Sequence, residues 1–183
     1  FMEWKYNYKN RTSDFSIFDG NMIFSKFPIQ DIPVIGTDNW WRYWRVNIIL
    51  DDKIAQLNLV HTSAPKNPRY FYQRNQQLRY LADSFIQNYS IDIDITFLLW
   101  DFNVSMRSTF YSVFVDKIDK FMTNIVWNSM YRNTRCLYFS SFCFPFTQID
   151  FIFTSDPQKV PFIEVIDIPG SDHKWFYWNI VFD

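Results

Sequence analysis

Phe97-Leu98-Leu99-Trp100-Asp101-Phe102-Asn103 is the stretch on which the interpretation of this chain rests. Residues 95–99 have the length and composition of a buried strand. Because side chains alternate along a strand, Asp101 and Asn103 can point the same way where the chain leaves the sheet. Two oxygen-bearing groups aimed together suit a hard cation such as Mg²⁺, or a phosphate. A strand that simply ends in an Asx turn explains the same residues. Other parts of the chain must therefore decide between a turn and a metal or phosphate site.

Length and composition limit the alternatives. The 183 residues suit one domain, 1–183, with a substantial core. The net charge of −1 gives no overall electrostatic case for binding long nucleic acids, although it leaves room for a local basic cleft. The aromatic share of 22% favours core filling over a base-stacking surface. Cys136 and Cys143 fit no metal or redox spacing, no apolar run approaches the roughly 18 residues of a membrane span, and no signal peptide is visible.

A predicted hairpin is followed directly by the first of the chain's two histidines. Residues 45–50 and 53–60 are strand-like and are joined by Asp51-Asp52, which predicts an antiparallel pair without the favoured glycine. His61 follows the second strand and can exchange a proton near neutral pH if it faces a cleft. A surface or capping histidine is the alternative.

Two helices are predicted from apolar spacing. The first covers about two turns, with Arg74 and Gln77 at its beginning on a solvated polar face. The second begins after Ser108 as N-cap. Their helix-spaced apolar residues are Leu78, Leu81, Ala82, Phe85 and Ile86 in the first helix, and Phe110, Val113, Phe114, Ile118 and Phe121 in the second.

Further strands are predicted at residues 21–24, 149–153, 163–168 and 175–182, with short strands and loop between 125 and 145. Asp150 stands at the beginning of an apolar strand, where a charge is costly to bury unless it is paired. Pro169-Gly170 makes a turn into Ser171-Asp172-His173.

These segments form an ordered set in which each member lies at a strand end or in the turn beside it. The set is His61-Thr62, Asp101-Phe102-Asn103, Ile149-Asp150-Phe151-Ile152 and Ser171-Asp172-His173. Together with residues 22–29, it resembles the endonuclease/exonuclease/phosphatase superfamily of deoxyribonuclease I-like nucleases, sphingomyelinases and inositol polyphosphate phosphatases. The resemblance implies an α/β fold, a four-layer sandwich of two packed, mostly antiparallel sheets with helices outside. It also implies a metal-dependent phosphoester cleft at one edge.

The resemblance also assigns roles. Asp101 and Asn103 match the motif that orients the attacking water and contacts metal or phosphate, and Asp172 is similar to the metal-ligand aspartate. His173 matches the histidine that binds the scissile phosphate, and Asp150 the aspartate that holds its ring. His61 matches the histidine that stabilises the phosphate or protonates the leaving group. A carboxylate beside an imidazole favours its protonated form, so an Asp150–His173 pair would present a cationic donor.

The chain departs from the family pattern in two places. Trp100 stands where the motif has glycine, which permits close approach and unusual backbone angles. An upstream Asn and a Gln-Glu, whose Glu is a principal metal ligand, are not found at the expected distance before Ser25. We therefore expect the domain to be N-terminally incomplete, without two strands and part of its metal site.

The predicted function is a Mg²⁺- or Mn²⁺-dependent phosphoesterase. The alternatives are a degenerate member that binds a phosphate-bearing partner without turnover, and a structural domain. The substrate is a phosphoester of a nucleic acid, phospholipid or phosphorylated small molecule, and no protein partner is evident. The localisation of the chain stays open: it is a soluble domain that can be a piece of a membrane-linked or secreted protein. Trp40, Trp41 and Trp44 form an exposed patch or, as we expect, pack between the sheets.

Overall fold

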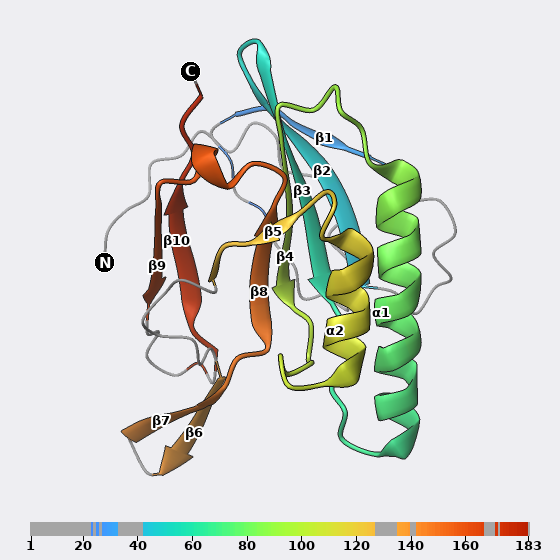
Figure 1. The fold of residues 1–183 in the computed structure, drawn as a ribbon. Coiled ribbons are helices and arrows are strands. Elements are labelled where there is room, and N and C mark those ends of the chain that lie inside the picture. The colour runs from blue at the N-terminus through green and yellow to red at the C-terminus, as the bar shows by residue number, and fades with distance from the viewer. Residues whose placement is uncertain are drawn as a thin grey trace.

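The computed structural model describes residues 23, 25, 27–32, 42–126, 135–139, 142–166, 171 and 173–182. It has a mixed α/β architecture (Figure 1). A six-stranded sheet has the order β1 (Ile29–Asp31), β2 (Arg42–Leu50), β3 (Lys53–His61), β4 (Ile95–Asp101), β8 (Asp150–Thr154) and β5 (Thr123–Asn124). Two-stranded sheets pair β9 (Phe162–Ile166) with β10 (Trp175–Asn179), and β6 (Arg135–Phe139) with β7 (Phe142–Thr147).

The described residues supply three layers. Helices α1 (Pro68–Asn88) and α2 (Thr109–Ile118) cover one face of the large sheet, and β9 and β10 lie on the other (Figure 1). Among the described strand pairs, β3 and β4 are parallel and the others are antiparallel. The predicted fold class, with two sheets, mostly antiparallel pairing and outer helices, is confirmed. No described helix has both the length and the apolar character that crossing a membrane requires.

Strand β4 lies between two hydrophobic clusters. Phe97 and Leu99 pack toward β9 and β10, whereas Leu98 packs under the helices. Both Phe97 and Leu98 are fully buried. A strand covered on both faces has no need of polar alternation, which is why residues 95–99 are continuously apolar.

The predicted hairpin is confirmed, with Leu50 paired to Lys53. Asp51 supplies the left-handed backbone that the turn needs, at φ 55°, because aspartate tolerates this region better than most residues. Trp44 is half-buried in the cluster between the sheets, and its Nε1 donates to Asp31 Oδ1 at 2.7 Å. Trp40, Trp41, residues 1–22 and most of the strand predicted at 21–24 lie outside the described residues.

Helix α2 begins as predicted, with the Ser108 hydroxyl accepting from the Phe110 amide. Helix α1 begins earlier than its apolar spacing indicates. Asn67 caps it by accepting from the Tyr70 amide, and Pro68 occupies the first turn, where its missing amide proton costs nothing. Phe121 falls beyond the end of α2.

Arg74 and Gln77 correct the prediction of a solvated polar face, since only 4% and 2% of their surfaces are exposed. Arg74 Nη1 donates to the Asn103 carbonyl at 2.6 Å, and Gln77 Oε1 accepts from the Ser63 amide at 2.7 Å. Burial lowers the pKa of the Arg74 guanidinium, which still carries its charge at neutral pH. The two side chains satisfy buried backbone groups and so tie the loops after β3 and β4 to α1.

Trp100 has a φ of 110°, in the region that glycine favours, and 40% of its surface is exposed. A side chain with a Cβ is strained there. The glycine of the family motif therefore corresponds to a backbone requirement that this chain meets at a cost in stability.

Replacing Trp100 tests this cost. Both Trp100→Gly and Trp100→Ala remove the ring, but only glycine removes the Cβ. We expect the glycine variant to have a free energy of unfolding about 1 kcal/mol higher than the alanine variant, measured by urea denaturation. An alanine variant of equal or greater stability would contradict the strain.

Replacing Arg74 tests the tie between α1 and the loop after β4. Arg74→Met leaves the Asn103 carbonyl and the Asn75 side-chain oxygen without the guanidinium donor. We expect the free energy of unfolding to fall by about 2–4 kcal/mol. The control Arg79→Met changes an exposed arginine of the same helix and should cost less than about 1 kcal/mol. Equal losses for both variants would show that the Arg74 bonds contribute little.

Candidate active site

The candidate site is built on a row of residues across three adjacent strands. In the parallel pairing of β3 with β4, His61 lies opposite Asp101. In the antiparallel pairing of β4 with β8, Asp101 lies opposite Asp150. Residues opposite one another across neighbouring strands present their side chains on the same face. Backbone pairing therefore brings one imidazole and two carboxylates to one edge of the sheet.

His173 completes this group from a distant part of the chain. Its Nδ1 lies 3.1 and 3.0 Å from the Asp150 oxygens Oδ1 and Oδ2, and its Nε2 lies 3.9 Å from Asp101 Oδ2. His61 Nε2 lies 3.7 Å from the same Asp101 oxygen. The two imidazoles thus approach one carboxylate, at distances too long for direct hydrogen bonds, while Asp150 orients the His173 ring.

Asn103 is held rigidly beside Asp101. Its backbone amide donates to Asp101 Oδ1 at 2.7 Å, and its side-chain Nδ2 donates to Asp101 Oδ2 and to the Thr62 carbonyl, each at 2.9 Å. Its φ of 47° is a left-handed conformation that asparagine tolerates. Because Nδ2 is the donating atom, the carboxamide has one favourable orientation. Its Oδ1 remains available as an acceptor in the described part of the chain.

Phe102 anchors the strand end between these two polar residues. It is fully buried under the helices, with ring centroids 5.5 Å from Phe114 and 5.7 Å from Phe151. Its backbone amide donates to the Ile149 carbonyl at 3.0 Å, and its carbonyl accepts from the Thr62 hydroxyl. The alternation along Asp101, Phe102 and Asn103 places the apolar ring in the core and leaves the two polar groups at the site.

Five of the six predicted site residues are therefore neighbours: His61, Asp101, Asn103, Asp150 and His173. Asp172 lies outside the described residues. The prediction missed Arg74 and Gln77 as supports of the site. A signal for them was present, because they continue the stripe of Leu78, Leu81 and Phe85 backward at helical spacing.

Ligand atoms of Asp101, Asp150 and His173 lie within 4.8 Å of one another and could gather around one cation. Both Asp150 oxygens already face His173 Nδ1. Both Asp101 oxygens likewise accept hydrogen bonds from Asn103. Carboxylate and amide oxygens suit a hard cation such as Mg²⁺ or Mn²⁺.

Solved structures share this fold. The D. rerio TDP2 structure with a single-strand DNA product has a TM-score of 0.60 at 14% identity, covering 84% of this chain and 67% of TDP2. An endonuclease/exonuclease/phosphatase from Beutenbergia cavernae has a TM-score of 0.60 at 15% identity, covering 85% and 46%. A mannosyl-6-phosphatase from Bacteroides thetaiotaomicron has a TM-score of 0.52 at 17% identity, covering 76% and 56%. Identities this low show the fold alone.

The match to a family model is more specific. No curated protein sequence matches the chain significantly. The model of the Endonuclease/Exonuclease/phosphatase family, however, matches residues 2–173, a span that includes every candidate site residue. This chain therefore belongs to the endonuclease/exonuclease/phosphatase family.

Proposed function

We propose that this chain is a divalent-metal-dependent phosphodiesterase that hydrolyses a phosphoester with an activated water. Members of its family are hydrolases that act on phosphoester bonds. The observation that carries the proposal is the His173–Asp150 pair facing Asp101. His61 approaches the same Asp101 carboxylate, with its Nε2 3.7 Å from Oδ2. An anion-binding imidazole and a water-orienting carboxylate within one small site are what phosphoester hydrolysis requires.

We assign each side chain a role that its contacts support. Asp101 and Asn103, locked together by two hydrogen bonds, orient the attacking water and accept its hydrogen bonds. Asp150 holds His173 so that Nε2 faces the site and donates to a non-bridging phosphate oxygen. His61 stabilises the phosphate from the other side, or protonates the leaving oxygen as the bond to phosphorus breaks.

Asp101 and Asn103, with Asp172, the residue before His173 in the sequence, would hold the metal ion. Their oxygen donors fit a hard cation, which usually keeps several water ligands of its own. When bound, the cation offsets charge on the non-bridging oxygens.

The substrate class is a phosphoester of a nucleic acid or of a phosphorylated small molecule. TDP2 is known with a single-strand DNA product, and another structural neighbour is a mannosyl-6-phosphatase. These two proteins carry the same fold and act on different phosphate compounds. The fold therefore supports the phosphoester class without selecting one compound.

Substitutions at the site test the catalytic roles. With bis-p-nitrophenyl phosphate and Mg²⁺, we expect Asp101→Asn and His173→Gln each to lower kcat at least about 100-fold. The control Asp116→Asn changes an exposed carboxylate on α2 and should leave the rate unchanged. Activity that survives both site variants would contradict the assignment. A folded chain that binds this substrate without hydrolysing it would favour a non-catalytic phosphate-binding member.

Metal binding is tested separately, by the thermal stability of the folded chain with and without Mg²⁺. Mg²⁺ at 100 times its dissociation constant should stabilise the folded chain by about 2.7 kcal/mol, seen as a rise in thermal midpoint that EDTA reverses. We expect Asp101→Asn to abolish most of this rise and Asp116→Asn to retain it. An equal rise in both variants would place the metal elsewhere.

A further inference from the structure

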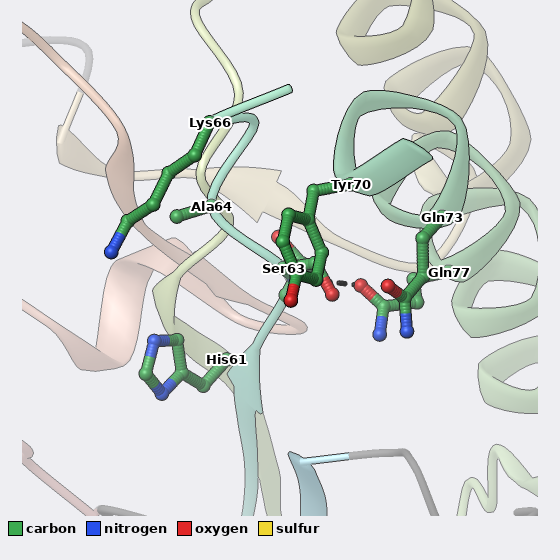
Figure 2. A pocket seen from close by; sticks show the side chains of 8 residues that line it. His61, Ser63, Ala64, Lys66, Tyr70, Gln73 and Gln77 are labelled. Atoms are coloured by element: carbon green, nitrogen blue, oxygen red, sulfur yellow. Dashed lines mark hydrogen bonds between the residues drawn. The ribbon is translucent and has the colours of Figure 1, made fainter. Parts of the chain in front are cut away.

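A pocket of about 470 Å³ opens beside His61, between the loop after β3 and the first turns of α1 (Figure 2). His61 belongs both to this pocket and to the candidate active site. The other side chains that matter here are those of Ser63, Lys66, Tyr70, Gln73 and Gln77. A volume of this size accommodates a small-molecule group, and none of the roles proposed above uses it.

The pocket offers several hydrogen-bond donors. Gln77 is almost fully buried, and its Oε1 is occupied by the Ser63 amide. The other end of this carboxamide, Nε2, has two hydrogens that no described residue accepts. Tyr70, Gln73 and Gln77 of α1 all line the pocket (Figure 2). Lys66 adds an ammonium group on the opposite wall.

The charged residues in the stretch of sequence that lines the pocket all have one sign. No Asp or Glu occurs between Asp52 and Asp83, a span that contains two lysines and three arginines. The first turn of α1 has no acidic residue, although acidic side chains are favoured at a helix N-terminus. Among the described residues that line the pocket, Lys66 carries the only permanent charge. A donor-rich, positively charged pocket favours an acceptor-only anion.

We propose that this pocket binds a second phosphate group of the substrate, adjacent to the phosphoester at His61 and Asp101. The inference rests on the proposed function, since the shared His61 is what places both phosphates on one molecule. The second phosphate is either the next phosphate of an oligonucleotide or a further phosphoryl group on a small molecule. The substrate therefore carries at least two phosphates.

The test measures binding without turnover. The full chain in EDTA is titrated calorimetrically with thymidine 3′,5′-bisphosphate and thymidine 5′-monophosphate, and with fructose 1,6-bisphosphate and fructose 6-phosphate. We expect at least one bisphosphate to bind about tenfold more tightly than its monophosphate. A preference confined to the thymidine pair identifies a nucleotide chain as the source. A preference confined to the fructose pair identifies a phosphorylated small molecule, and equal preferences show recognition of phosphate alone.

Variants locate the preference in the pocket. Lys66→Gln should reduce it about fivefold, and Gln73→Glu should abolish it by placing a carboxylate against the phosphate. Lys66 is exposed and Gln73 is partly buried, so we expect both variants to keep the fold. The matched control Lys120→Gln removes an exposed lysine beyond the end of α2 and should leave the preference intact.

Failure of this inference is distinguishable from failure of the proposed function. The inference is overturned if neither bisphosphate binds more tightly than its monophosphate, or if the preference survives both pocket variants. Hydrolysis of bis-p-nitrophenyl phosphate would then still support the phosphodiesterase. A preference that depends on Lys66 in a chain that hydrolyses nothing would support the pocket and overturn the phosphodiesterase.

Discussion

The pairing register of β3, β4 and β8 is the constraint on which the candidate site depends. It sets His61 opposite Asp101 and Asp101 opposite Asp150. A slip of one residue in β4 would turn Asp101 toward the helices and move Leu98 to the opposite face of the sheet, because strand side chains alternate. The apolar residues of β4 therefore fix the site as firmly as its polar residues do. Phe97 and Leu98 are fully buried in different clusters, and the slip would exchange their faces and force both clusters to repack, which is costly.

The loops that leave these strands are held by polar contacts from α1. Arg74 donates to the Asn103 carbonyl, and Gln77 accepts from the Ser63 amide. Phe102 adds an apolar anchor in the aromatic core. Asn103 can thus keep a left-handed backbone and two bonds to Asp101. A site that must present charges in a fixed arrangement benefits from supports that lie on rigid elements.

Charge is divided between two neighbouring regions. Asp101 and Asp150 form an acidic centre that suits a cation and an oriented histidine. From Lys66 to Arg79, in the loop before α1 and the first half of that helix, every charged residue is basic. His61 stands at the boundary of the two regions. This division suits the proposed function, in which a metal ion would offset the acidic centre, and the proposed second phosphate, which would lie against α1.

The sequence by itself determined the main elements around the candidate site, and it named the candidate site residues. The apolar run before Asp101, the Asp51-Asp52 joint and the Ser108 cap are local signals, readable because strand period, turn chemistry and capping involve neighbours in the chain. The motif order also indicated the family. Only the tertiary structure decided the strand register that brings His61, Asp101 and Asp150 together. It also decided the burial of Arg74 and Gln77 and the pocket beside His61. These depend on contacts between segments that lie far apart in sequence. Thr62 and Asn103, which follow β3 and β4, are 41 residues apart, and Arg74 of α1 is 29 residues from Asn103. Buried polar side chains such as Arg74 and Gln77 make hydrogen bonds to backbone groups of distant segments, and no local sequence pattern reveals these bonds.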